Sequence, residues 1–598
     1  MSAPPSRKLY LNAGTEPVFA VHHPAAPHAG GARGAVICPP FGWDDVSAYR
    51  SLRAWAQQLA DSGFDVLRIS FPGTGDSGGS PQDPDRLEAW SRAVEQSASH
   101  LVHGVEVQRV AVLGLGLGGL MACHALRRGA AIDDLVLWGV PATGRSMLRQ
   151  LRAFSRLEQS TFYEGLSPPP VPPTPATGAL EAGGFLLSAQ TVTDLEGLDL
   201  TDPPPPPAAG VRVLLLDRDG MAADESLRSG LERAGAAVTV AAGPGYGALT
   251  SHPQRSRTPT EVIERVTVWL EQAPTTTDGR LGAPSPTLTP VASDTALLTT
   301  TTGAALRETP VELTMSFGRL DGILTEPMSD ARSDLCAVLL NAGAVRRIGP
   351  SRMWVEAARR WGALGVPTLR LDVEGIGEAD GGQRPYAEDG SLYVPQLVPQ
   401  VLAALDALQE RGLGDRFILA GLCAGAYWSF NAALADDRIA AAMLINPRAL
   451  VWDPELLPAR DIHTLLRGKP SWTRVRRGAS MDRARALARF ALASTGRWFL
   501  RRRPSQDLLT ATLDVLVERW LVSGKRLLLL FSADEPLASE LARTERLSRL
   551  QASAQTITAY VAVRDHTLRP SWAQQQVHAA LDSVLMLELE QAPVPATN

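Results

Sequence analysis

The sequence predicts an α/β protein built from two tandem domains, each a mostly parallel sheet flanked by helices. Short runs rich in Val, Ile and Leu alternate with amphipathic helical stretches along the chain. The same order of motifs occurs twice, so the two halves form an internal repeat. A chain of 598 residues is long enough for two domains that each bury a full core.

The repeat is visible in four pairs of segments, each with one member in either half. They are GAVICPPFGW (34–43) and CAVLLNAGAV (336–345), FDVLRISFPGTGDSGG (64–79) and VPTLRLDVEGIGEADGG (366–382), VAVLGLGLGGLMA (110–122) and FILAGLCAGAYWS (417–429), and VRVLLLDRDG (211–220) and KRLLLLFSADEP (525–536). Each half is predicted to open with an antiparallel hairpin. The predicted domains are 1–271 and 305–598, joined by a Thr/Pro/Ser-rich linker at 272–304.

Composition narrows the classes of function. The net charge of −5 gives no global case for binding nucleic acid or a membrane surface. The N-terminal stretch has no apolar signal segment, and no uncharged apolar run reaches the roughly 20 residues of a membrane span. The four cysteines show no metal-binding spacing and are sparse, as in a reducing compartment. We expect a cytoplasmic protein without a metal, a cofactor or a transmembrane segment.

The strongest chemical motif is GLCAGA, at Gly421 to Ala426. It follows the apolar run RFILA and precedes a predicted helix, which is the strand–turn–helix context of a nucleophile elbow. The glycines permit a sharp turn, and the following helix N-terminus favours a thiolate. Cys423 therefore stands at the nucleophile position. The competing interpretation is a small buried apolar residue, and the partners downstream weigh against it.

Two partners for Cys423 follow later in the chain. His566, in VRDHTLRP, lies between a strand-like run and a C-terminal helix and is the predicted general base. The loop SADEP offers two acids, of which Glu535 aligns best and Asp534 remains open. Asp565, beside the histidine, is the weakest candidate. The order nucleophile, acid, histidine is that of the elbow fold.

Backbone N–H groups are predicted to stabilise an oxyanion near Cys423. One belongs to Ala424, directly after the nucleophile, and the other to Gly343 or Ala344 in the NAGAV loop. Such donors contribute about 3–4 kcal/mol at the transition state.

Both halves resemble the α/β-hydrolase superfamily. The motifs RLDVEGIGEADG, GLCAGA, FSADEP and RDHTLRP, with NAGAVRRIGPSRMW, carry the resemblance. It is greatest to the serine-aminopeptidase-like and dienelactone-hydrolase-like branches, including hydrolases of exosortase and exopolysaccharide loci, and implies two tandem α/β-hydrolase domains with lid insertions. Dienelactone hydrolases and some carrier-protein thioesterases use a cysteine nucleophile and need no cofactor, so the resemblance implies the same here.

The first half is predicted to be a degenerate copy. Its elbow reads GLGLGG, and Gly116 stands at the nucleophile position without a side chain. The run also resembles a dinucleotide fingerprint, but the surrounding repeat explains it better. His252 is a doubtful base, and Asp217 and Asp219 are open as structural acids. This half could dock like half of a dimer, cover the second site, bind a partner or only stabilise the chain.

A lid is predicted at about 449–520, and its middle is basic. We expect partner-docking arginines at Arg474, Arg476, Arg477, Arg485, Arg501 and Arg502. The acidic partner that fits is an acyl carrier protein with its phosphopantetheine arm, or a CoA-linked substrate. A solvated helix face is the competing interpretation.

The sequence thus predicts a cysteine-dependent acyl hydrolase, thioesterase or acyltransferase acting on an ester or thioester through a covalent acyl-enzyme. The alternative is an inactive pseudo-hydrolase that serves as a scaffold or binding module. Cleavage of short peptides is a weaker third hypothesis. A role in biosynthesis follows only from the resemblance.

Overall fold

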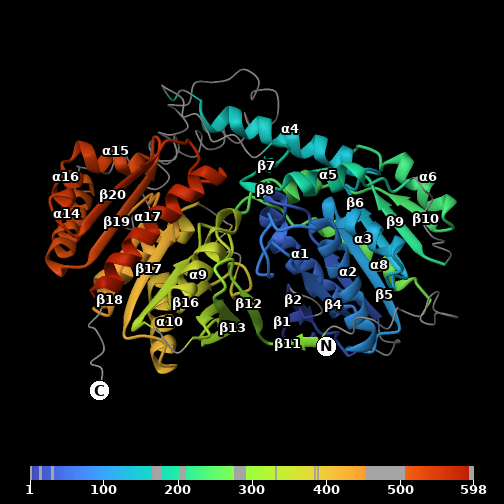
Figure 1. The fold of residues 1–598 in the computed structure, drawn as a ribbon, viewed down its shortest axis with the longest axis horizontal. Helices are drawn as coiled ribbons and strands as arrows, with labels where there is room; N and C mark the ends of the chain where they lie inside the picture. Colours follow the sequence, from blue (N-terminus) through green and yellow to red (C-terminus); the bar gives the residue numbers. More distant parts are fainter. Residues whose placement is uncertain are drawn as a thin grey trace, which may run out of the picture.

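The computed structural model describes the greater part of the chain. The described residues are 3–12, 16–27, 33–164, 166, 177–201, 210–274, 291–329, 333–382, 386, 389–451 and 505–591. Within them each half carries a nine-stranded sheet, and helices cover both faces of each sheet (Figure 1). The two predicted α/β domains are therefore present.

The first sheet has the order β10-β9-β6-β5-β3-β4-β2-β1-β11. Its strands are β1 (Arg7–Asn12), β2 (Val18–His23), β3 (Arg33–Cys38), β4 (Phe64–Ile69), β5 (Arg109–Leu115), β6 (Asp134–Trp138), β9 (Arg212–Leu216), β10 (Ala237–Ala241) and β11 (Val291–Ser293). The six strands from β10 to β4 are parallel, while β1 and β2 form an antiparallel hairpin.

The second sheet repeats this topology in the order β12-β13-β14-β16-β15-β17-β18-β19-β20. Its strands are β12 (Ala296–Thr299), β13 (Ala305–Met315), β14 (Gly318–Pro327), β15 (Leu335–Leu340), β16 (Thr368–Asp372), β17 (Arg416–Leu422), β18 (Ile439–Ile445), β19 (Arg526–Ser532) and β20 (Thr556–Val561). The hairpin β13–β14 matches β1–β2. The strands β15, β16, β17, β18, β19 and β20 match β3, β4, β5, β6, β9 and β10 in that order.

Part of the predicted linker belongs to the sheets. β11 pairs with β1 of the first sheet, and β12 pairs with β13 of the second. An exposed sheet edge carries backbone N–H and C=O groups without hydrogen-bond partners. β11 and β12, which contain Val and Thr, supply these partners at the two edges. The linker prediction at 272–304 is corrected to this extent. Residues 275–290 lie outside the described part of the chain.

Helices of the first half pack on both faces of its sheet. They are α1 (Trp43–Asp61), α2 (Arg86–His103), α3 (Leu117–Arg127), α4 (Gly144–Phe162), α5 (Ala189–Gly197), α6 (Glu225–Arg233), α7 (Tyr246–Leu249) and α8 (Thr260–Glu271), with a small hairpin of β7 (Leu180–Ala182) and β8 (Phe185–Leu187). Along β3, Ala35 and Ile37 pack with α1 and α8, whereas Val36 and Cys38 pack with α2 and α3. This alternation follows from the two-residue period of a strand.

The second half has the same layering. Its helices are η1 (Pro350–Arg352), α9 (Met353–Ala363), η3 (Asp389–Leu392), η4 (Pro395–Leu397), α10 (Val398–Glu410), α11 (Ala424–Ala435), α14 (Ser505–Ser523), α15 (Pro536–Arg543), α16 (Arg546–Gln551) and α17 (Ser571–Glu590). α9 and α17 cover one face of the sheet, and α10, α11 and α14 cover the other. One apolar cluster includes α2 and α3 together with α9 and α17, so the two halves share a core.

A reciprocal exchange of carboxylates joins the halves. Asp76, in the loop after β4, pairs with Arg370 of β16 and with Arg347 at 3.0 Å. Glu378, in the matching loop after β16, pairs with Arg68 of β4 at 2.5 Å. Asp76 and Glu378 occupy corresponding positions of the repeat, as do Arg68 and Arg370. The contact is therefore that of a two-fold dimer carried within one chain.

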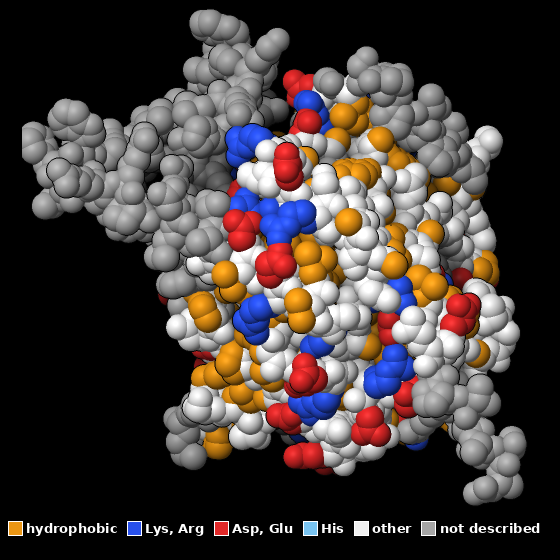
Figure 2. Space-filling model, turned by 90° about the vertical axis from the view of Figure 1, so that its left-hand side faces the viewer, with side chains coloured by type: hydrophobic (Ala, Val, Ile, Leu, Met, Phe, Trp, Pro, Cys, Tyr) orange, Lys and Arg blue, Asp and Glu red, His pale blue; other side chains and the backbone are white. Residues whose placement is uncertain are grey.

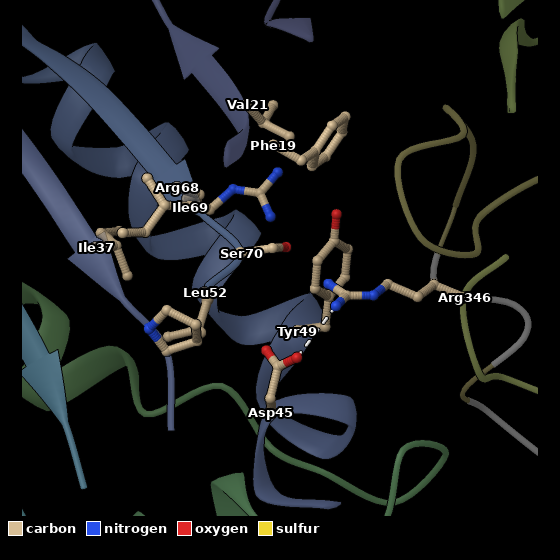
Figure 3. A pocket seen from close by; sticks show the side chains of 11 residues that line it. Phe19, Val21, Ile37, Asp45, Tyr49, Leu52, Arg68, Ile69, Ser70 and Arg346 are labelled. Atoms are coloured by element: carbon tan, nitrogen blue, oxygen red, sulfur yellow. Dashed lines mark hydrogen bonds and ion pairs between the residues drawn. The ribbon is translucent and has the colours of Figure 1, made fainter. Parts of the chain in front are cut away.

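A small cavity of about 20 Å³ lies beside these pairs, between the halves (Figure 3). In Figure 3, Arg346 of the second half reaches over Tyr49 toward Asp45, both on α1. Its guanidinium carbon lies 3.8 Å from the centre of the Tyr49 ring and its Nη2 lies 3.1 Å from Asp45. The polar contact thus continues past the two exchanged carboxylates.

Charges are mixed on the described face of the C-terminal half (Figure 2). Between α14 and α16, Arg546 pairs with Asp514 and Arg549 pairs with Glu518. In the described part of the chain, no helix has the length and apolarity needed to span a bilayer.

Replacing Asp76 is expected to destabilise the whole protein. Positive charge on Arg347 and Arg370 outweighs burial and lowers the pKa of Asp76 to about 2. Asp76→Asn leaves both buried arginines under-compensated, so urea unfolding should show a loss of about 3–5 kcal/mol. The stabilisation by Asp76 is full above about pH 4 and disappears as the pH falls toward about 2.

The matched control is Glu225→Gln on the exposed end of α6, where the side chain is 74% exposed. Its unfolding free energy should change by less than about 0.5 kcal/mol. Equal stability of the Asp76 variant and this control would show that the exchanged carboxylate does not hold the halves together.

Candidate active site

Cys423 lies at a sharp turn between β17 and α11. Its backbone angles are φ 60° and ψ −113°, a conformation that residues other than glycine rarely adopt. The turn needs glycine on either side, because a Cβ at Gly421 would overlap the backbone of Gly425, and one at Gly425 would overlap the Asn341 carbonyl. These close approaches explain the GxCxG pattern and place the thiol at the carboxyl edge of the sheet.

The loops after β19 and β20 bring the predicted base and one predicted acid together. His566 Nδ1 lies 2.8 Å from Glu535 Oε1. Glu535 is buried, while the Asp534 side chain is 64% exposed and pairs with Arg564. Asp565 accepts hydrogen bonds from the Arg569 and Thr567 groups of its own loop. Among the three acids, the structure therefore places Glu535 alone against the imidazole.

Asn446 and Ser532, which the sequence analysis did not single out, tie these loops together. Asn446 donates to Ser532 Oγ at 3.0 Å and to the His566 carbonyl at 2.7 Å. Ser532 in turn donates to Glu535 Oε1 at 3.0 Å. Asn446 directly follows β18 and has a positive φ of 44°. A polar residue at the end of a predicted strand was the signal in the sequence that could have pointed to it.

The thiol and the imidazole perturb each other strongly. Burial alone would raise the pKa of Cys423, but His566, Arg448 and Tyr393 together lower it to about 7. Burial alone would lower the pKa of His566, but Cys423 and Glu535 raise it to about 10. Near neutral pH the pair is therefore substantially thiolate and imidazolium. The buried Nε2 of His566 makes no hydrogen bond of ordinary geometry to a described residue.

Tyr393 contacts the sulfur directly. Its hydroxyl lies 3.0 Å from Cys423 Sγ, and its ring packs edge-on against Tyr427. Burial raises the pKa of Tyr393 well above its ordinary value, so the phenol keeps its proton and can donate it to a thiolate. Tyr393 comes from the loop between η3 and η4, far from any motif, and the sequence carried no signal for it.

The predicted oxyanion donors lie on two elements that meet at the elbow. Ala424 is the first residue of α11, where backbone N–H groups have no partner within the helix. Gly343 has a φ of 58°, and a Cβ placed on it would meet nothing within 4 Å. Ala344 follows it in the tight turn closed by Ala342 and Val345. The loop and the helix start are in contact, because Gly425 packs on Asn341.

The first half braces the loop that carries His566. The Arg564 N–H donates to the Phe162 carbonyl at the end of α4, at 2.8 Å. Arg569 pairs with Glu158 of α4 at 2.5 Å, and Trp572 donates to the Tyr163 hydroxyl at 3.0 Å. α4 is thus part of the wall that positions His566 of the other domain.

The elbow of the first half keeps its backbone but lacks a nucleophile. Gly116 has φ 51° and ψ −118°, close to the angles of Cys423. Tyr246 stands five residues after β10, as His566 stands five after β20, and its hydroxyl lies 3.1 Å from where a Gly116 Cβ would be. His252 is exposed and lies further along, near Trp43. Asp219 accepts hydrogen bonds from the Gly245 and Gly247 N–H groups, and Asp217 from Ala223.

The predicted docking arginines lie outside the described residues, which resume at 505 with α14. They are Arg474, Arg476, Arg477, Arg485, Arg501 and Arg502. In the described part of the chain, no group of three His, Cys, Asp or Glu side chains is arranged to hold a metal ion.

Comparison with known proteins identifies the class. The model of the "Alpha/beta hydrolase family" matches residues 23–318, a stretch that contains Gly116 but not Cys423. With the two sheets described above, this match defines the protein as one of the α/β-hydrolase fold. No curated protein matches the sequence.

Solved structures that resemble the chain include three bacterial proteins, each at low identity. Est1E from Butyrivibrio proteoclasticus, solved with ferulic acid, is 17% identical, with 44% of this chain and 98% of that one covered and a TM-score of 0.31. The esterase EaEST from Exiguobacterium antarcticum is 13% identical, with coverage of 44% and 99% and a TM-score of 0.29. A serine hydrolase homologue from Coxiella burnetii is 14% identical, with coverage of 46% and 96% and a TM-score of 0.28.

Alkylation by iodoacetamide is expected to select Cys423 and to follow its thiolate. Burial raises the pKa of the other three thiols, that of Cys123 to about 12, and all three are buried. Peptide mass mapping should find one adduct, whose rate of formation rises through an inflection near pH 7. Adducts spread over several cysteines, or an inflection near 9, would contradict the ion-pair interpretation.

Tyr393→Phe is expected to raise the pKa of Cys423. A hydrogen bond to a charged group contributes about 1.5–3 kcal/mol, which corresponds to an upward shift of about 1–2 units. The alkylation profile should move by that amount with little change in melting temperature. Tyr560→Phe, at an exposed position of β20, is the control and should leave the profile in place.

Proposed function

We propose that the second half is a cysteine-dependent acyl hydrolase or acyltransferase that acts on an ester or thioester through a covalent acyl-enzyme. The observation that carries the proposal is the electrostatic coupling of Cys423, at a strained elbow, to His566, whose Nδ1 is hydrogen-bonded to Glu535. Nucleophile, base and orienting acid are the arrangement that acyl transfer requires.

The geometry supports a two-step reaction. The Cys423 thiolate attacks the acyl carbonyl, and the oxyanion is placed against the N–H of Ala424 and one from the loop at Gly343 and Ala344. The His566 imidazolium gives its Nε2 proton to the departing alcohol or thiol, which leaves the acyl group on sulfur. The neutral imidazole then takes a proton from water or an acceptor hydroxyl or amine, whose attack releases the acid or the transferred product and regenerates the thiolate.

The substrate class follows from the nucleophile. Attack of a thiolate on a thioester breaks one carbon–sulfur bond and forms another, so a carrier-bound or CoA-bound acyl thioester suits Cys423, and an activated ester is the simpler substitute. An acyl carrier protein remains a prediction of the basic segment. The first half is proposed to be catalytically inactive, because Gly116 supplies no nucleophile.

Brief exposure to acyl thioesters and p-nitrophenyl esters of graded chain length is expected to add the mass of one acyl group. Intact-protein mass spectrometry should show the adduct in the native protein and not in Cys423→Ala. His566→Ala should lower its rate of formation by about 10²–10⁴-fold. Decay of the adduct with and without an added amine distinguishes hydrolysis from transfer.

Cys336→Ala is the matched control, since this thiol is fully buried in the same sheet. It should acylate as the native protein does. A folded protein that forms no adduct with any donor would favour the alternative, in which both halves serve as a scaffold or binding module.

A further inference from the structure

A cavity of about 160 Å³ lies over the empty elbow of the first half. Gly116 and Leu117 form its floor, and the loop of Phe41 and Gly42 forms one side. This loop follows β3 as the loop of Gly343 and Ala344 follows β15, so the cavity occupies the place of an acyl pocket. An engineered cavity of about 150 Å³ binds benzene, so this one has room for a small organic ligand.

Most of the lining residues are apolar or aromatic, and several polar groups share the surface of the cavity with them. Trp43, Met147, Leu151 and Phe154 line the body of the cavity. Arg218 also lines it, with its guanidinium carbon 4.4 Å from the centre of the Tyr246 ring and its Nη1 donating to Gln150 at 3.2 Å. An apolar cavity with a small set of fixed polar groups is the usual form of a small-molecule site.

The polar groups favour an anionic head group. The guanidinium of Arg218 is a planar cation whose N–H groups can pair with a carboxylate. Burial raises the pKa of Tyr246, so its hydroxyl remains a donor beside Gly116. Asp44 is the one acidic residue among the lining residues, and burial raises the pKa of its carboxyl to about 6 despite Arg218, so it gives up its charge more readily than an ordinary carboxylate and is neutral below about pH 6.

α4 connects this cavity to the other half. Met147, Gln150, Leu151 and Phe154 of α4 line the cavity. Further along the helix, Glu158 and Phe162 hold Arg569 and Arg564 of the His566 loop. Figure 1 shows α4 running along the first half toward the second.

We propose that the first-half cavity binds a small monocarboxylic acid with an aromatic or branched aliphatic body, and that α4 transmits its occupancy to the His566 loop. The carboxylate lies against Arg218 and Tyr246 at the start of α3, and the apolar body lies between Trp43 and Phe154. Binding exchanges the Arg218–Gln150 hydrogen bond for one to the ligand, which changes the constraint on α4. The effect on His566 rests on the proposed function of Cys423, whereas binding does not.

Isothermal titration of the full-length protein with benzoate, benzamide and benzylamine tests the binding site. Benzoate is expected to bind at least tenfold more tightly than the other two, and Arg218→Met should weaken it at least tenfold. Arg228→Met, at a position of α6 where the side chain is 43% exposed, is the control and should change affinity less than twofold. Asp44→Asn should preserve or increase the affinity, and Leu151→Trp, which fills the cavity, should abolish binding with an unchanged melting temperature.

Three results would overturn the assignment of the site. They are tighter binding of benzylamine, equal binding of benzamide, or no binding of any probe by the folded native protein. Each would show that the cavity does not recognise a carboxylate.

The coupling is measured by the rate of iodoacetamide alkylation at Cys423 with and without saturating benzoate. A change of threefold or more that disappears in Arg218→Met supports transmission through α4. An unchanged alkylation rate with benzoate bound would refute the coupling, while the proposal of a binding site would stand. Failure of Cys423 to form acyl adducts would refute the proposed function, while calorimetry would still report on the cavity.

Discussion

Two carboxylates exchanged between the halves hold the molecule in one arrangement. Asp76 forms ion pairs with arginines of the second half, and Glu378 forms an ion pair with Arg68 of the first half. The two carboxylates stand at matched positions of the repeat. Burying a charged group costs free energy unless an opposite charge pairs with it. Each half therefore needs the other half to pair with its own buried charges. Their burial requires both halves to be docked, and the shared apolar cluster of α2, α3, α9 and α17 then follows.

This docking changes what each half has to do. The loop with His566 receives backbone and ion-pair contacts from α4, an element of the half that has glycine at its elbow. The first half therefore stabilises the His566 loop even though residue 116 is a glycine. The preserved elbow angles at Gly116 agree with this, because the turn is part of the close packing of β5 on α3 and does not depend on a catalytic side chain.

The chemistry of the second half depends on a balance between burial and charge. Burial by itself would keep the thiol of Cys423 protonated and the imidazole of His566 neutral. Glu535 stabilises the imidazolium, and the imidazolium, Arg448 and Tyr393 stabilise the thiolate. Asn446 and Ser532 fix the distances on which this balance depends, since they join the ends of β18 and β19 to the histidine loop.

The sequence by itself determined the α/β class, the repeat, the succession of strands along the chain and the place of Cys423 at the elbow. Strand periodicity, the glycine pattern of the elbow and the recurrence of motifs can all be read from the sequence, which is why these features were predictable. It left Asp534 and Glu535 open, since adjacent residues in a loop point in different directions that only folding sets. It gave no sign of Tyr393, and it assigned residues 291–299 to a linker although the two sheet edges take them up as β11 and β12. Only the tertiary structure decided the exchange of Asp76 and Glu378, the bracing of His566 by α4 and the cavity over Gly116, because each joins residues far apart in the chain.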